Sequence, residues 1–161
     1  MAKTIPLSQG LYALVDDADF ERLTRRKWYA RRTASGFYAM SNRSRRLGVK
    51  RAVFMHREII NAPPGSICDH VNGNTLDNRR ENLRLATSNQ NRMNARRQSN
   101  NKTGYKGVSY EIRRGRWRSD IRPFGEHVFL GYFDDPKSAA IAYNEAAHKY
   151  YGEFSRINQV D

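Results

Sequence analysis

The sequence predicts an α+β fold. A small N-terminal α+β unit leads into a strand–loop–strand–helix segment, and a three-stranded antiparallel sheet packed on one helix follows. Two observations predict this class. Short runs of apolar and aromatic residues alternate with polar ones, as in half-buried strands, and clusters of Gly, Asn, Asp and Pro separate them. One longer stretch, residues 136–151, carries its apolar residues at helical spacing.

The first sixty residues alternate between strand and helix patterns. Residues 18–27 place Phe20 and Leu23 on one side of a helix and arginines on the other. Two aromatic segments flank a Thr-Ala-Ser-Gly turn, which predicts a hairpin. We therefore expect strands at residues 11–15, 28–30, 37–40 and 51–55, a basic connection at 43–50, and a short helix at 55–60.

Residues 67–93 gather the side chains that suit catalysis. A short strand is expected to end on Asp69-His70, and the polar residues 71–80 have loop composition. A second strand at 83–87 leads to Ser88, which can cap a helix carrying Asn91. Strand, loop, strand and helix would fold Asp69, His70 and Asn91 toward one point, as a metal ligand set beside a base.

This stretch, D-H-V-N-G-N-T-L-D-N-R-R-E-N-L-R-L-A-T-S-N-Q-N, resembles the HNH nuclease motif in its ββα-metal version, found in phage and intron homing endonucleases. About eight positions agree in order. The resemblance implies that Asp69 and Asn91 hold one divalent cation at the scissile phosphate. It also implies that His70 is the general base for water and that Asn82 organises the loop. Asn91 stands where the family often has a second histidine.

The residue types fit that chemistry. Carboxylate and amide oxygens suit a hard cation, so Mg²⁺ is the expected ion, Mn²⁺ is an alternative, and zinc is not expected. A histidine titrates near neutral pH and can take a proton from water. His56 could support a phosphate or the metal, although a packed structural histidine is the stronger expectation. One such site makes one cut, so a monomer should nick, and a double-strand break would need a dimer.

The charge points to a polyanion. The chain has 29 Lys plus Arg against 16 Asp plus Glu, a formal charge of +13. Twelve basic and no acidic residues lie within 22–57, and ten basic and two acidic residues lie within 92–122. Neither of these stretches has the periodicity of a membrane-surface helix. Arg57 and Arg84 are candidates for phosphate contacts, or they could pair with Asp77 or Glu81.

The single cysteine, Cys68, excludes an internal disulfide and a Cys-pair zinc site. We expect it to pack as a small apolar residue. The N-terminus has no apolar segment long enough for a signal peptide, and no membrane span follows. The expected location is the cytoplasm, that of the host cell if a phage encodes the protein.

Composition divides the chain. Residues 94–103 are polar and basic, which predicts a linker that stays mobile until DNA orders it. The nuclease domain is then 1–93, and a second module spans 104–158. We expect its strands at 105–110, 116–122 and 127–133, and its helix from Asp134 or Asp135 to about Tyr151. Alternation places Arg116, Arg118, Asp120 and Arg122 on one face, with Trp117, Ser119 and Ile121 on the other.

The second module, through G-Y-K-G-V, R-W-R-S-D-I-R and A-A-I-A-Y-N-E-A-A, resembles the Apetala-two (ethylene-response-factor) DNA-binding domain. That family lays its sheet in the major groove, as paired strands can. The resemblance carries DNA contacts over to Lys106, Trp117, Arg122 and Phe129. The chain departs from the family at Ser109 and Phe129, so base preference is not transferred. Further candidates are the arginines of the second strand and its turn: Arg113, Arg114, Arg116 and Arg118.

Together these features predict a metal-dependent endonuclease of the homing type that cuts double-stranded DNA, as a monomer or weak dimer with no small-molecule substrate. The alternative is a catalytically inactive DNA-binding transcriptional regulator, with which the basic residues are equally compatible. The set Asp69, His70, Asn82 and Asn91 favours the enzyme, because binding alone does not require it. An RNA nuclease is a weaker alternative, since the second module resembles a duplex-DNA reader.

Overall fold

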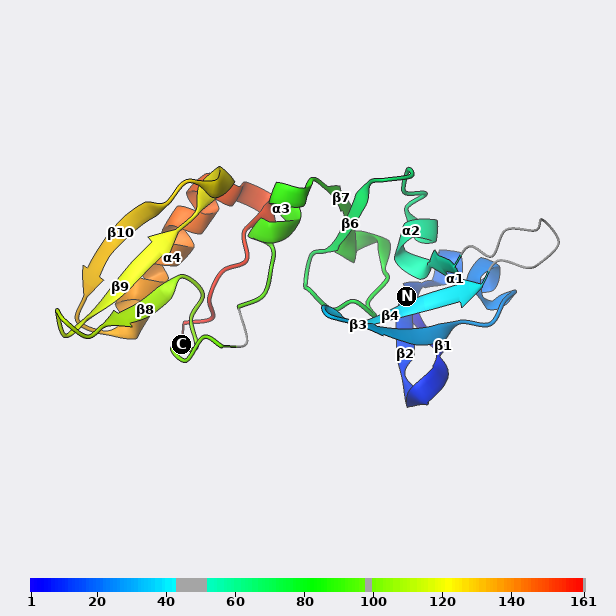
Figure 1. The fold of residues 1–161 in the computed structure, drawn as a ribbon. Helices are drawn as coiled ribbons and strands as arrows, with labels where there is room; N and C mark the ends of the chain where they lie inside the picture. The colour runs from blue at the N-terminus through cyan, green and yellow to red at the C-terminus, as the bar shows by residue number, and fades with distance from the viewer. Residues whose placement is uncertain (43–51, 98–99, 161) are drawn as a thin grey trace. The chain divides into compact units, whose positions relative to one another are not determined.

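The computed structural model describes residues 1–42, 52–97 and 100–160 and confirms the mixed α+β architecture, with several small antiparallel sheets and few helices (Figure 1). The chain forms two compact units, Met1–Thr87 and Ser88–Asp161. The division lies at Thr87, before the segment 94–103 that the sequence predicts as a linker. The basic connection expected at 43–50 lies outside the described residues.

The first unit combines three antiparallel sheets with two short helices. One strand, β1, is absent from the sequence prediction, because only Ile5 of its five residues is buried and the strand ends at a proline. The elements in chain order are β1 (Ala2–Pro6), β2 (Tyr12–Asp16), α1 (Asp17–Thr24), β3 (Tyr29–Thr33), β4 (Gly36–Asn42), β5 (Ala52–Phe54), α2 (Met55–Ile59), β6 (Ile67–His70) and β7 (Leu83–Ala86). The sheets pair as β1–β2, β3–β4–β5 and β6–β7.

One hydrophobic core joins these sheets. Its buried members come from nearly every element: Ile5, Ala13, Val15, Leu23, Trp28, Ala39, Met55, Ile59 and Leu83. The indole of Trp28 also donates a hydrogen bond to the carbonyl oxygen of Leu23 at 2.8 Å, which closes the end of α1. Since Leu83 begins β7, the β6–β7 hairpin is attached to the same core as the N-terminal strands.

The second unit is a three-stranded antiparallel sheet covered by one long helix. Its elements are α3 (Ser88–Met93), β8 (Val108–Glu111), β9 (Arg116–Ile121), β10 (Val128–Phe133) and α4 (Pro136–Tyr151), and the strand order is β10–β9–β8. The side chain of Asp135 accepts a hydrogen bond from the Ser138 amide and caps α4, and the helix ends at Gly152, as the sequence predicts.

Small residues let α4 lie close to the strands. Its buried alanines are Ala139, Ala140, Ala146 and Ala147. Gly107 has φ +76°, and a Cβ there would lie 2.1 Å from the Tyr143 ring, so only glycine fits. Ser119 and Ile121 face this core, which confirms the predicted alternation of β9.

Hydrogen bonds hold the segment that the sequence predicts as a mobile linker. The Lys106 ammonium donates to the carbonyl oxygens of Met93 and Ala95, at 2.7 and 2.8 Å. The side chain of Asn101 accepts from the amides of Thr103 and Gly104. The described part of 94–103 therefore makes internal contacts, and its mobility before DNA binding stays a prediction. Among the described residues, no helix is both long and apolar enough to span a bilayer.

Candidate active site

The predicted metal and base residues end the β6 strand. Antiparallel pairing with β7 sets Asp69 opposite Arg84 and His70 opposite Leu83. Because Leu83 belongs to the hydrophobic core, the register of this hairpin is fixed. Asp69 and His70 are both buried, at 6% and 4% exposure, so the hairpin carries its two reactive side chains inward.

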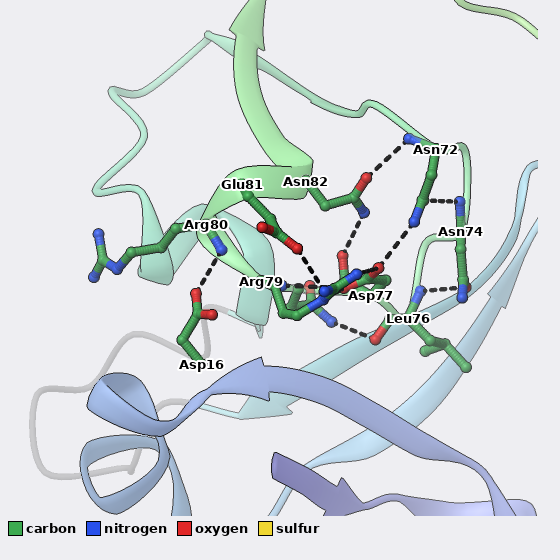
Figure 2. A network of polar contacts seen from close by, with 10 residues as sticks. Asp16, Asn72, Asn74, Leu76, Asp77, Arg79, Arg80, Glu81 and Asn82 are labelled. Atoms are coloured by element: carbon green, nitrogen blue, oxygen red, sulfur yellow. Dashed lines mark hydrogen bonds and ion pairs between the residues drawn. The ribbon is translucent and has the colours of Figure 1, made fainter. Parts of the chain in front are cut away.

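Asn82 braces the loop that follows His70 (Figure 2). Its side-chain oxygen accepts from the Asn72 amide at 2.8 Å, and its amide nitrogen donates to the Asp77 carbonyl oxygen at 2.7 Å. The side chain of Asn72 donates in turn to the Asp77 carboxylate at 2.8 Å. One buried amide thus joins the start of the loop to its end.

The same loop is attached to the N-terminal elements. The Leu14 amide donates to the Leu76 carbonyl oxygen, and the Asn78 amide donates to the Leu14 carbonyl oxygen, so β2 runs beside the loop. The guanidinium of Arg80 binds both carboxylate oxygens of the buried Asp19 in α1, at 2.7 and 2.9 Å. The strand β2 and the helix α1 therefore hold the loop in its shape.

Aromatic rings enclose His70. Its ring centroid lies 5.1 Å from that of His56 and 5.9 Å from that of Tyr38. Burial is the largest influence on the pKa of His70 and lowers it, while Asn78 and the neighbouring carboxylates act in the opposite direction. The imidazole is therefore neutral at pH 7, which is the form that can accept a proton.

His56 is a second buried histidine of the site. Burial, with His70 and Arg57 as lesser causes, lowers its pKa to about 3, so its ring stays neutral. Its Nδ1 atom has no hydrogen-bond partner among the described residues. Tyr38 and Phe54 pack around it, with ring centroids at 5.5 and 5.3 Å. These contacts fit the packing role that the sequence favours.

Arg84 binds the predicted metal ligand. Its Nε and Nη2 atoms donate to Oδ2 of Asp69 at 2.9 and 2.8 Å. The pairing of Arg84 with Asp77 or Glu81, which the sequence left open, is wrong, because Arg79 binds both of those carboxylates. A carboxylate can accept about four hydrogen bonds, so the two bonds from Arg84 leave Asp69 with further acceptor positions.

Arg57 also binds groups of its own unit. It donates to the carbonyl oxygens of Ser66 and Pro63, both at 2.6 Å, and so closes the loop between α2 and β6. For Arg57 too, the alternative that the sequence left open, a pairing with Asp77 or Glu81, is not found among the described residues, where Arg79 binds both carboxylates. Cys68 lies 3.8 Å from the Arg57 guanidinium, and burial raises the pKa of its thiol.

The predicted donor set fits a hard cation. The predicted ligands are the carboxylate of Asp69, in the first unit, and the amide oxygen of Asn91, an exposed residue of α3 in the second unit. Both are oxygen ligands of the kind that Mg²⁺ and Mn²⁺ prefer, and neither is a thiolate or imidazole of the kind that selects zinc.

The open face of the second unit's sheet, opposite α4, carries several of the predicted DNA contacts. Arg118 donates to both oxygens of Asp120, at 2.7 and 2.8 Å, and its guanidinium lies over the Phe129 ring. Arg114 lies over the Tyr132 ring, and Arg116 pairs with Asp134. The cations on this face are therefore held in position by rings and carboxylates.

Four further candidates lie elsewhere in the second unit. Trp117 packs against the buried cluster under α4, so it faces away from the open side. Lys106 is tied to two carbonyl oxygens, and burial lowers its pKa to about 8. Arg113 is exposed in the turn before β9, and Arg122, also exposed, follows the end of that strand.

Sequence reasoning missed several residues that shape the site. Asp77 and Asn72 complete the hydrogen bonds around Asn82. Asn78 opposes the lowering of the His70 pKa by burial, and Tyr38 packs against the His70 ring. The only signal for the first three is the polar composition of the loop, which does not say which side chains turn inward. Tyr38 lies 32 positions before His70, and only the fold brings the two rings together.

We predict that Asn82→Ala lowers stability by roughly 1–3 kcal/mol, because it removes the bond to the Asn72 amide and leaves the buried carbonyl oxygen of Asp77 without this partner. Urea unfolding of the full chain measures the change. The control is Asn74→Ala, whose exposed side chain bonds within the same loop. Equal losses in the two variants would contradict a special bracing role for Asn82.

Comparison with known proteins relates the chain to two viral proteins, one of them named an HNH endonuclease. A family profile described as HNH endonuclease matches residues 61–93. Protein 3.8 of Escherichia phage T7 is 31% identical over 95 residues, which cover 59% of this chain and 78% of that protein. Uncharacterized HNH endonuclease L560 of Acanthamoeba polyphaga mimivirus is 28% identical over 155 residues, or 95% of this chain and 78% of that protein.

A second group of relatives is found in plants. AP2-like ethylene-responsive transcription factor TOE2 of Arabidopsis thaliana is 46% identical over 56 residues, which are 35% of this chain. The match covers only 12% of the plant protein, so this chain spans about an eighth of that relative. No solved structure matches the chain.

Proposed function

The chain belongs to the HNH endonuclease family, and we propose that it is a metal-dependent DNA endonuclease of the homing type whose second unit directs it to its site. The observation that carries the proposal is the β6–β7 hairpin, which ends on a buried Asp-His pair and is followed by a loop braced by one buried asparagine.

Each residue of the hairpin has a distinct part in the proposed reaction. His70 takes a proton from the attacking water, and its low pKa keeps the imidazole neutral for that step. Asn82 holds the loop so that the imidazole keeps one orientation. Arg84 orients the Asp69 carboxylate through its two bonds to one oxygen. The surrounding rings of Tyr38 and His56 exclude water from one side of the base.

Asp69 and Asn91 would hold one divalent cation, Mg²⁺ or Mn²⁺. When bound, such an ion neutralises charge on the scissile phosphate and on the leaving oxygen. The support for this assignment is the oxygen-only donor set and the family, whose members generally use a divalent metal.

A plasmid-nicking assay tests the proposal. Supercoiled plasmid incubated with the full chain and Mg²⁺ should convert to the open circle, and chelation by EDTA should stop the conversion. Linear product without prior open circle would indicate a dimer that cuts both strands. Absence of any conversion with Mg²⁺ or Mn²⁺, together with intact duplex binding, would favour a DNA-binding regulator instead.

We further propose that the open sheet face of the second unit reads the DNA target. The support is the row of arginines held over rings on that face and the similarity to plant transcription factors. Strand pairs fit the major groove, and arginine can bond guanine edges there.

Arg118 and Arg122 should contribute differently to binding. If Arg118 contacts only phosphate, Arg118→Ala should weaken all duplexes alike and lower the salt slope by about one. If Arg122 reads a base edge, Arg122→Ala should cost about 1–3 kcal/mol on the preferred site and much less on random DNA. Competition between target and random duplexes measures both. An isolated second unit with no DNA affinity at low salt would contradict targeting by this unit.

A further inference from the structure

The second unit contains a cleft of about 860 Å³ whose lining is strongly basic. The lining comes from the segment after α3, from Lys106 and β8, from the end of β9 and from two tyrosines of α4. Its cations are Arg92, Arg96, Arg97, Lys106 and Arg122. Among the described lining residues, the one carboxylate is that of Asp120, which Arg118 and His127 already bind.

Three of these arginines have no carboxylate partner among the described residues. Arg92 bonds the side-chain oxygen of Asn89 at 3.1 Å, and Arg97 bonds the carbonyl oxygen of Asn101 at 2.8 Å. Arg122 is exposed and makes no side-chain ion pair with a described residue. By contrast, seven other described arginines pair with Asp or Glu, Arg79, Arg80 and Arg84 among them, so the cleft concentrates unbalanced positive charge.

Hydrogen bonds within the protein order the backbone that lines the cleft. Lys106 donates to the carbonyl oxygens of Met93 and Ala95, which fixes the chain between Arg92 and Arg97. The amide of Ala95 donates to the Arg92 carbonyl oxygen, and Met93 is buried. A cation cluster whose backbone is already ordered loses less conformational entropy on binding than a mobile tail would.

An exposed aromatic ring lies at the rim. Phe124 shares a smaller adjoining hollow with Arg92, Lys106 and Arg122. Its side chain is 69% exposed, and its backbone has φ +53°, a conformation that costs a non-glycine residue energy. Strained, exposed aromatic residues beside cations are suited to packing on a sugar or base.

We propose that this arginine cleft (Arg92, Arg97, Lys106 and Arg122, with Phe124 at its rim) binds a phosphodiester segment of duplex DNA, as a second contact surface besides the open sheet face. Arg92 and Arg97 bind phosphate oxygens, and Phe124 packs against the adjacent sugar. The inference rests on the proposed function in that the ligand is DNA, and it adds Arg92, Arg97 and Phe124, which neither the motif nor the sheet face includes.

Duplex binding by the full chain in EDTA, measured by fluorescence anisotropy over a range of NaCl concentrations, tests the cleft. Arg92→Gln/Arg97→Gln should reduce the slope of log affinity against log salt by about 1.8, since each lost phosphate contact releases about 0.9 fewer counterions. The control is Lys137→Gln/Lys149→Gln, which removes two charges from α4 outside the cleft and should leave the slope unchanged. Equal slopes in the two double variants would overturn the proposal.

Two single variants keep the test decisive if the double variant unfolds. Arg97→Gln alone alters an exposed side chain and should lower the slope by about 0.9. Phe124→Ser should weaken binding by roughly 5-fold or more without changing the slope, because an apolar contact releases no counterions. Parent-like affinity and slope in both variants would overturn the proposal.

Inorganic phosphate carries the same charged oxygens as the DNA backbone and is the alternative ligand of the cleft. Calorimetric titration with inorganic phosphate that shows binding, combined with parent-like DNA slopes in the arginine variants, would assign the cleft to a small anion and overturn the DNA proposal. Plasmid nicking is scored separately. If the full chain nicks plasmid but the arginine variants keep the parent salt slope, only the cleft proposal is rejected. If the variants lower the slope but the full chain does not nick, only the endonuclease proposal is rejected.

Discussion

Replacing His70 with alanine is expected to reduce nicking by roughly 10²–10⁴-fold, the usual contribution of a general base. Duplex affinity should stay close to that of the parent, because the imidazole is buried and acts in the chemical step. Single-turnover nicking at saturating enzyme measures the rate, and anisotropy in EDTA measures the affinity.

His127→Ala is the matched control for His70→Ala, since it removes an exposed histidine of the second unit. That variant should nick at nearly the parent rate once saturated with DNA. A His70→Ala protein that nicks as fast as His127→Ala would rule out His70 as the base.

The second large effect concerns the metal. Asp69→Ala should bring nicking down to the level seen with EDTA, because it removes the one charged ligand of the proposed cation site. It should also destabilise the fold by roughly 3–5 kcal/mol, since it leaves the mostly buried Arg84 guanidinium without its carboxylate. Calorimetric titration with Mg²⁺ or Mn²⁺ should show weaker binding than in the parent.

A double variant separates the two consequences of losing Asp69. Asp69→Ala/Arg84→Met removes both charges, so it should regain much of the lost stability while remaining inactive. Thermal unfolding and nicking of the same preparations give both readouts. Recovery of nicking in the double variant would mean that Asp69 serves the fold alone and that the metal has other ligands.

The sequence predicted the regular elements well where a period was clear. Residues 83–86 alternate around a buried Leu83, and α4 begins at Asp135 with Pro136 in its first turn, so both were found within a residue or two. The strand β1 was missed, because a five-residue edge strand with one buried side chain has no period to detect.

Long-range partners could not be read from the sequence. Arg84 binds Asp69 because the hairpin register sets the two opposite each other, and Arg80 binds Asp19 from 61 positions away. A carboxylate three or seven positions from Arg84 is the natural guess from sequence alone, and here Arg79 binds both of those, Glu81 and Asp77. Lys106 illustrates the same limit, since it bonds the carbonyl oxygen of Met93, just before the segment expected to be a linker, and that of Ala95 within it.

The attachment of the loop to β2 and α1 has a consequence for protein engineering. A fragment cut to the boundaries of the family match, 61–93, would contain the reactive pair but would leave Leu14 and Asp19 behind. Grafted onto another DNA-binding protein, it would also lose the core that receives Leu83. The transferable nuclease cassette is therefore the whole of the first unit together with α3, and shorter transplants should lose activity through a collapsed loop.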